Sequence, residues 1–113
     1  MPYSIRSEPG PDGRLIVLSG DADLTAAAEL QEMVTAAASE GDKTVTIDLS
    51  DATLIDSRTI SVLVEWTESL SSAGGRLQVI CSNPNILRLL ARIGLDRTLR
   101  VFATRDEAQS SSA

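Results

Sequence analysis

The first polar and apolar positions of the chain predict a β-hairpin. Residues 3–7 alternate between apolar and polar side chains, and the apolar run RLIVLS (14–19) is bounded by Gly20. Between them, EPGPDG (8–13) holds the prolines, aspartate and glycines that are typical of turns. We expect two short strands joined by this turn.

Three later stretches repeat apolar residues at the spacing of one helix face. The first carries apolar side chains at Leu30, Met33, Val34 and Ala37, which are spaced i, i+3, i+4 and i+7. Gly41 marks its end. Asp23 and Thr25 are both candidates for its N-cap. The second covers 58–72 and ends at Gly74-Gly75, and the third begins at Asn83-Pro84 and stops at Gly94. These patterns predict three helices.

Strands are predicted between these helices. Residues 44–50 place valine, isoleucine and leucine on one side and threonine and aspartate on the other, and a turn is expected at 51–53. Further strands are predicted at 76–81 and 99–103, followed by a helical turn near 105–108. The order is ββαβαβαβ with a final α, which indicates an α/β fold: a mixed sheet with helices packed mainly on one side. We expect one domain over 1–109 and a flexible polar tail over 110–113.

Composition and charge argue against some classes of binding partner. The chain has 113 residues, a formal net charge of −6 and no segment that resembles a signal peptide or a membrane span. An acidic surface repels phosphate backbones and anionic lipid, so we expect neither nucleic-acid binding nor membrane insertion. The single cysteine, Cys81, is interpreted as a small buried hydrophobe in a reducing compartment, and the protein as cytoplasmic.

The chain lacks several residue types and motifs that enzymes commonly use for catalysis. It contains no histidine, which excludes Ser-His-Asp and Cys-His catalysis and most zinc sites. No glycine-rich phosphate loop precedes Lys43, its only lysine. The aspartates Asp21, Asp23, Asp48 and Asp51 could form a magnesium site, but isolated surface aspartates are commoner, and we predict no metal, no cofactor and no catalytic residue.

One serine stands where a buried segment passes directly into a helix. The stretch TVTIDLSDATLIDSRTISVL (44–63) places Ser57 at this junction, after Asp56. Ser57 is interpreted as an N-cap, accepting a hydrogen bond from a backbone N–H, and it is either a cap only or also a site of phosphorylation. A phosphate there would add about −1.5 to −2 charge beside the positive end of the helix dipole, partly compensated by Arg58. Such a charge would repel acidic groups of a partner without refolding the domain.

The helix that follows has an unusually wide apolar face. One stripe contains Ile60, Leu63, Val64, Thr67 and Leu70, and Val62 and Trp66 widen it to an arc of about 200°, where about 100° suffices for one core. Either neighbouring elements cover this helix on two sides, or Val62 and Trp66 lie at the edge as anchors for a partner. We favour burial for Trp66.

The order of elements and several short motifs resemble the STAS family, whose founding members are anti-sigma-factor antagonists. The motifs are G-x-x-D (Gly20 to Asp23), a strand ending in D-L-S, I-D-S before a helix, G-G-R-L (74–77), N-P-N-I-L-R-L-L and G-L-D (94–96). Their order and spacing cover nearly the whole chain.

The resemblance implies a regulatory protein and not an enzyme. A GHKL-type serine kinase that is also an anti-sigma factor would be bound by the unmodified protein, would phosphorylate Ser57 (with Thr59 as fallback), and would then be released. A metal-dependent serine phosphatase would reset the switch, and the ATP and magnesium belong to the kinase. The resemblance places the partner-binding residues at Asp23, Asp56, Arg58, Thr59, Ser61 and Val62.

The helix start departs from the family pattern. Family members usually continue D-S-S-G-L-G, whereas this chain has Arg58 in place of the second serine, and Thr59 and Ser61 in place of the glycines. Added side chains crowd a surface on which a partner's backbone comes close. An alternative function is therefore a STAS adaptor subunit that is not phosphorylated, for example in a lipid or solute transporter. Nucleotide binding by the domain itself is a weaker third idea.

Overall fold

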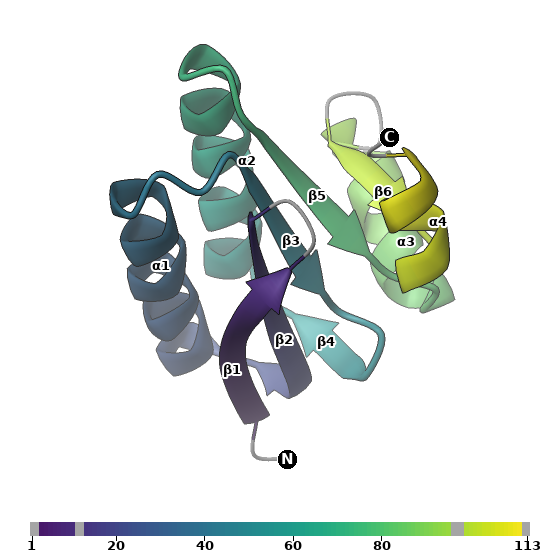
Figure 1. The fold of residues 1–113 in the computed structure, drawn as a ribbon. Coiled ribbons are helices and arrows are strands. Elements are labelled where there is room, and N and C mark those ends of the chain that lie inside the picture. The colour runs from purple at the N-terminus through teal and green to yellow at the C-terminus, as the bar shows by residue number, and fades with distance from the viewer. Residues whose placement is uncertain (1–2, 11–12, 96–98, 112–113) are drawn as a thin grey trace.

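The computed structural model describes residues 3–10, 13–95 and 99–111, and it forms an α/β fold (Figure 1). The elements along the chain are β1 (Tyr3–Gly10), β2 (Gly13–Ala22), α1 (Leu24–Ser39), β3 (Thr44–Asp48), β4 (Ala52–Ile55), α2 (Ser57–Ser72), β5 (Arg76–Ile80), α3 (Pro84–Arg92), β6 (Arg100–Phe102) and α4 (Arg105–Ser111). The predicted α/β class, the first hairpin and the final helix are confirmed.

The described strands form one mixed six-stranded sheet with the order β1-β2-β3-β5-β6, and β4 pairs with β2 outside this path. Only the β1–β2 hairpin is antiparallel. The long strand β2 pairs through its first half with β3 and through its last residues with β4. Parallel neighbours joined by crossover helices bring the carboxyl ends of the strands to one edge of the sheet.

The turn predicted at 51–53 is wrong, because Ala52 and Thr53 belong to β4. This strand is held by bonds to a distant segment: Gly20 N–H donates to the Asp51 carbonyl at 3.0 Å, and Asp56 N–H donates to the Ala22 carbonyl at 3.2 Å. The four residues of β4 contain no local sequence pattern from which this pairing could be predicted. β4 ends beside β2, so that α1 and α2 begin next to each other.

The aliphatic core lies between the sheet and helices α1, α2 and α3. Val45 and Ile47 of β3, Leu30 of α1 and Leu63 of α2 are fully buried, and Leu90 of α3 belongs to the same cluster. The alternation predicted for β3 therefore describes its two faces correctly. Figure 1 shows α1 and α2 running side by side in the same direction, with α4 on the opposite side of the sheet.

A glycine pair after α2 is required by geometry. Gly74 has φ 83°, in the left-handed region that favours glycine, and the N–H of Gly75 donates to the Leu70 carbonyl at 2.7 Å. A Cβ on Gly75 would lie only 2.3 Å from the Lys43 carbonyl oxygen. The two glycines therefore end α2 and let β5 enter the sheet close to the start of β3.

Two predicted segments extend beyond the described residues. Positions 11–12 of the predicted turn at 8–13 lie outside them, and β1 already includes 8–10. Helix α4 continues to Ser111, two residues into the segment 110–113 for which a flexible tail was expected, and 112–113 lie outside the described residues. Asp96 of the G-L-D motif also lies outside them.

A tyrosine joins the first strand to α1. The Tyr3 hydroxyl donates to the Glu29 carboxylate, and this hydrogen bond, together with burial and the negative charge of Glu29, raises the pKa of Tyr3 to about 12. Tyr3 is the only tyrosine of the chain, so the change in phenolate absorbance with pH reports this residue alone.

We expect Tyr3 to ionise at about 12 in the folded protein and near 10 in denaturant. Because the folded-state pKa is the higher one, the contact stabilises the fold fully below about pH 10 and is lost as pH rises through 12. Glu29→Ala should bring the pKa back toward 10, whereas Glu32→Ala, on the exposed side of α1, should not. An unchanged titration in Glu29→Ala would contradict the contact.

Candidate functional site

The predicted modification site lies where β4 passes into α2, beside the start of α1. In the parallel pair β2–β4, Ala22 is opposite Ile55. Asp23 and Asp56 follow these two residues, and each caps the helix that begins next. The register therefore brings two helix N-termini together at one edge of the sheet, with the partial positive charge of both helix dipoles.

The N-cap of α2 is Asp56, and the interpretation of Ser57 as the cap is wrong. Asp56 has extended dihedrals (φ −97°, ψ 176°), and its Oδ1 accepts hydrogen bonds from the Thr59 N–H at 2.9 Å and from the Thr59 hydroxyl at 3.1 Å. Asp56 thus satisfies one of the N–H groups that a helix start leaves without a partner.

Ser57 is the first helical residue, and its side chain is exposed. Its carbonyl oxygen accepts a hydrogen bond from the Ser61 hydroxyl at 3.1 Å, whereas its own hydroxyl makes none to any residue that the structure describes. Because Asp56 provides the cap, the Ser57 hydroxyl is not needed to hold the helix. It is accessible to an enzyme, and a group attached to it would lie at the positive end of α2.

Two residues expected at the partner-binding surface point into the core instead. Thr59 has no exposed surface and cannot contact a partner in this fold, and Val62 is only 4% exposed, at the floor of a groove between α1 and α2. The same burial removes Thr59 as a fallback acceptor of phosphate. The wide apolar arc of α2 did not determine which part of the helix faces the core. Packing against α1 and β5 selects the orientation that buries these two side chains.

The other predicted residues are accessible. Arg58 and Ser61 are exposed and line a groove of about 610 Å³ between α1 and α2, together with Leu24, Glu32 and Glu65. Asp23 is exposed and accepts from the Ala26 N–H at 3.0 Å, which makes it the cap of α1 and excludes Thr25. Asp56 is half-buried.

Sequence reasoning missed two exposed leucines near this edge. Leu24, the first residue of α1, is 67% exposed, and Leu54, in β4, is 53% exposed. Leu54 is opposite Asp21 in the β2–β4 pair, one residue before the buried Ile55. A solvated apolar residue of this size costs free energy unless another molecule covers it. Their signal in the sequence is weak, because Leu54 directly precedes the buried Ile55 and Leu24 lies two residues before the buried Ala26.

Trp66 and Cys81 behave largely as expected. Trp66 is partly buried and packs against the core, so it is no protruding anchor. Cys81 is 1% exposed, and burial is the main cause that raises the pKa of its thiol. A raised thiol pKa disfavours the reactive thiolate.

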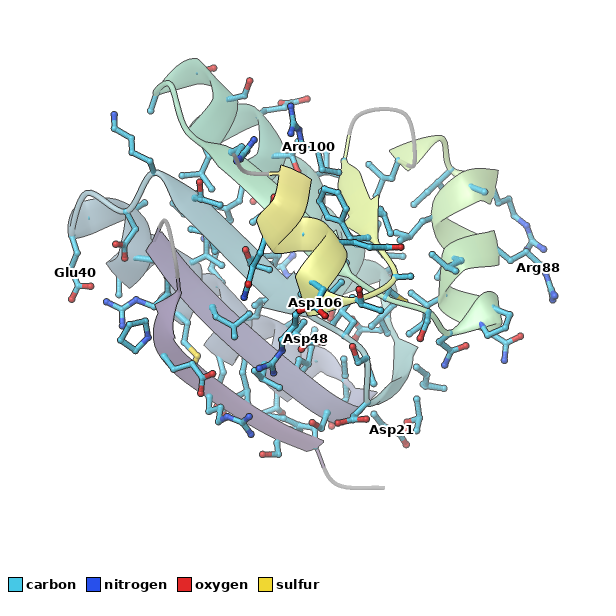
Figure 2. All side chains as sticks on the ribbon, turned by 45° about the vertical axis from the view of Figure 1, so that its right-hand side comes forward. Asp21, Glu40, Asp48, Arg88, Arg100 and Asp106 are labelled. Atoms are coloured by element: carbon cyan, nitrogen blue, oxygen red, sulfur yellow. The ribbon has the colours of Figure 1, made fainter. Side chains whose placement is uncertain are left out.

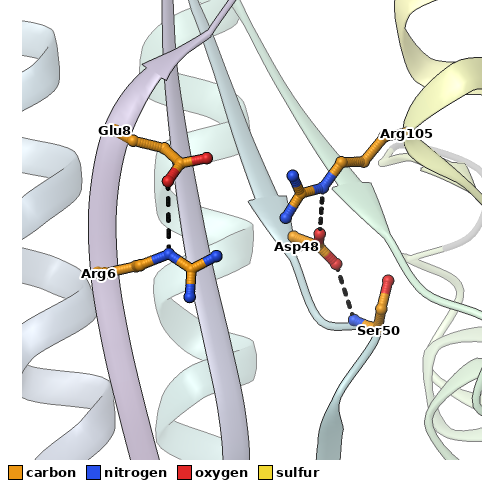
Figure 3. Close-up of polar contacts among 5 residues, drawn as sticks. All are labelled: Arg6, Glu8, Asp48, Ser50 and Arg105. Carbon is orange, nitrogen blue, oxygen red and sulfur yellow. Dashed lines mark hydrogen bonds and ion pairs between the residues drawn. The ribbon is translucent and has the colours of Figure 1, made fainter.

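Three of the four aspartates considered for magnesium, Asp21, Asp23 and Asp48, have other side-chain contacts. Asp48 Oδ2 accepts from Arg105 Nε at 2.8 Å, and its Oδ1 accepts from the Ser50 N–H at 2.9 Å (Figure 3). Burial alone would raise the pKa of Asp48, but the bonds from Ser50 and Arg105 and the charge of that guanidinium lower it overall. Asp21 accepts from the Thr53 hydroxyl. Within the described residues, no three cysteine or carboxylate side chains are grouped as metal ligands.

Comparisons with known proteins identify the family of this chain. A family model described as "Mlab, STAS domain" matches residues 9–101. A protein of Thermotoga maritima, named as a candidate anti-sigma factor antagonist, is 33% identical over 69 residues, which are 61% of this chain and 61% of that protein. The chain thus matches about three fifths of the length of this relative.

Solved structures share the fold over nearly the whole chain. An anti-sigma factor antagonist from Mycobacterium paratuberculosis has a TM-score of 0.87 at 24% identity, covering 97% of this chain and 93% of that one. The anti-sigma factor antagonist SpoIIAA in its unphosphorylated form has a TM-score of 0.78 at 18% identity, covering 96% and 97%. Its phosphorylated form, from Bacillus, also has 0.78, at 19% identity, covering 97% and 100%. Within the described residues, no helix is long and apolar enough to cross a membrane.

Proposed function

The chain belongs to the STAS family and resembles anti-sigma factor antagonists in sequence and fold, and from this premise we propose that it is a switch protein controlled at Ser57. Unmodified, it binds a GHKL-type serine kinase that is also an anti-sigma factor, and so frees a sigma factor in the cytoplasm. The kinase transfers the terminal phosphoryl group of ATP to the Ser57 hydroxyl, and the modified protein is released. A metal-dependent serine phosphatase restores it.

The single observation that carries this proposal is the exposed hydroxyl of Ser57 at the first position of α2, which bonds to none of the described residues. Asp56 holds the helix start on its own, so a phosphate can be added without the loss of a cap. The first N–H groups of α2 and the Arg58 guanidinium stabilise the added charge. In this role the protein is a substrate of the kinase and not an enzyme, and the nucleotide and magnesium are bound by the kinase.

The partner surface in this proposal surrounds Ser57 and follows the accessible residues. Arg58, Ser61 and Asp23 provide polar contacts, and Leu24 and Leu54 supply the apolar area that a partner would cover. Apolar side chains around the Ser57 hydroxyl would place the added phosphate at the centre of the interface. Its charge would weaken binding most there, because the centre is desolvated. The side chains that replace the glycines of the family pattern do not block a partner's approach to Ser57, because Thr59 is buried and Ser61 faces the groove.

Mass spectrometry of the protein from its native cells tests the modification. Trypsin cleavage after Lys43 and Arg58 releases the peptide 44–58, which contains Ser57. We expect fragment ions that place phosphate on Ser57, with more missed cleavage at Arg58 in the modified peptide. The next peptide, 59–76, is an internal control for the position of the phosphate. We expect none on Thr59, which is buried, and none on Ser61, although Ser61 is exposed.

An unmodified peptide across growth and stress conditions would reject phosphorylation at Ser57. The domain would then be better explained as an adaptor subunit of a transporter, a role that needs the fold and an interaction face but no modification. Phosphate on Ser61 without phosphate on Ser57 would move the switch by one turn and would also contradict the proposal.

A further inference from the structure

The outer face of α3 is basic and partly apolar. Arg88 and Arg92 are exposed and lie one turn apart, and the exposed Leu87 and Ala91 form a second stripe beside them. Figure 2 shows Arg88 extending outward from α3. Neither arginine makes an ion pair or a side-chain hydrogen bond to any residue that the structure describes. This face therefore carries two positive charges that the chain itself does not neutralise.

The groove between α1 and α2 carries the opposite charge at its inner end. Glu32 and Glu65 line it from the two helices, and both are exposed. Each glutamate comes nine residues after the cap of its helix, Asp23 or Asp56, so the parallel helices place both carboxylates at the same height. Neither forms an ion pair within the described part of the chain. Two carboxylates across one groove repel each other, and a positive side chain between them relieves this repulsion.

The groove also offers apolar surface to a docked element. Ala28 and Val62 line it, and Leu24 is 67% exposed at its mouth. Its volume of about 610 Å³ lies within the range of about 300–1,000 Å³ that is usual for binding clefts. Arg58 lines it as well, but is seven residues before Glu65 on α2, about 10 Å along the helix. Amphipathic helices commonly bind with their apolar side chains in such a groove.

We propose that α3 of one copy of this chain docks in the α1–α2 groove of a second copy. The two arginines of α3 pair with the two glutamates of the groove, and the apolar stripe of α3 packs on the groove floor. Figure 1 shows α3 on the far side of the molecule from α1, so a chain cannot fill its own groove. Such a contact between two different surfaces closes into a dimer when it is reciprocal, and otherwise joins copies in a series.

Self-association of this kind covers the groove beside Ser57. Arg58 and Ser61 line the groove and belong to the partner surface proposed above. A copy whose groove is filled by α3 of another copy is therefore not available to the kinase. Only this consequence rests on the proposed function, because the contact between copies needs neither a kinase nor a phosphate.

Sedimentation equilibrium of the purified full chain tests the contact. At about 0.15 M salt the net charge of −6 is screened beyond about 8 Å, whereas ion pairs at contact distance persist. We expect the average mass to rise above that of the monomer as the concentration increases to about 1 mM, in keeping with a small, transient interface. A monomer mass over this whole range would overturn the proposal.

Charge reversal identifies the two surfaces. Arg88→Glu combined with Arg92→Glu should weaken association at least about tenfold, because like charges then meet at the contact. Glu32→Arg combined with Glu65→Arg should have the same effect. The variant with all four changes should associate as the wild type does, since both pairs are restored with exchanged signs. Failure of this fourfold variant to recover association, with a native circular dichroism spectrum, would overturn the proposal.

Two controls and one further measurement complete the test. Arg6→Glu and Glu68→Arg make the same charge changes at exposed positions outside both surfaces and should leave association unchanged. If a variant fails to fold, dilution of the wild type followed by amide NMR spectra still decides. The amide shifts should fall on α3 and on the groove residues of α1 and α2, and shifts confined to other elements would contradict the contact. Phosphorylation of Ser57 enters none of these measurements, so this contact and the proposed function can fail separately.

Discussion

Ser57→Asp is expected to weaken binding to the kinase partner by at least about tenfold, while Ser57→Ala is expected to bind as tightly as the wild type and to remain unmodified. Aspartate places a permanent negative charge at the first position of α2, on an exposed side chain at the centre of the proposed partner surface. Like charges brought together in an interface cost several kcal/mol, and each 1.4 kcal/mol is about a factor of ten.

The measurement is the equilibrium binding of each purified variant to the purified kinase, at two salt concentrations. Ser72→Asp is the matched control, because it adds the same charge at an exposed position at the other end of α2 and should leave binding unchanged. The Ser57→Asp effect should shrink at high salt, since exposed charges are screened. Tight binding by Ser57→Asp would reject an electrostatic switch, and weak binding by both variants would show a general sensitivity to charge.

Asp56→Ala is expected to lower the free energy of unfolding by about 2–4 kcal/mol. Loss of a helix cap costs about 0.5–2 kcal/mol, and the buried Thr59 hydroxyl would lose the Asp56 carboxylate to which it donates, for about 1–3 kcal/mol more. In a domain of this size the melting temperature should fall by about 8 °C or more. Denaturant unfolding followed by circular dichroism measures the change.

Two further variants separate the cap from the buried hydroxyl. Asp23→Ala removes the cap of α1, where no buried threonine depends on it, and should cost only about 1 kcal/mol. In Asp56→Ala combined with Thr59→Val, both hydrogen-bonding partners are gone, and part of the lost stability should return. Equal losses for Asp23→Ala and Asp56→Ala, with no recovery in the double variant, would mean that the Asp56–Thr59 contact contributes nothing beyond capping.

These two predictions address neighbouring residues with separate roles. Asp56 holds the start of α2 through its contacts with Thr59, whereas the Ser57 hydroxyl makes no hydrogen bond to any of the described residues. A phosphate on Ser57 would therefore change the charge of the surface more than the stability of the fold.

The sequence by itself determined the elements whose signals are local. Asn83 caps α3 and Pro84 is its first helical residue, as their spacing predicted, and the alternation in β3 separates its buried aliphatic face from the face that carries Asp48. Capping and side-chain alternation depend on neighbours a few positions away in the chain. The family followed from the order of these elements and the motifs between them.

Only the tertiary structure decided the details of the site. β4 exists because β2 offers it hydrogen bonds from more than thirty residues away, and its position makes Asp56, rather than Ser57, the cap of α2. The rotation of α2 that buries Thr59 and Val62 depends on which elements pack against its wide apolar arc. The position of α4 likewise depends on long-range contacts, such as the ion pair between Arg105 and Asp48 of β3. Burial is a property of packed pairs of elements, and one chain segment alone does not contain it.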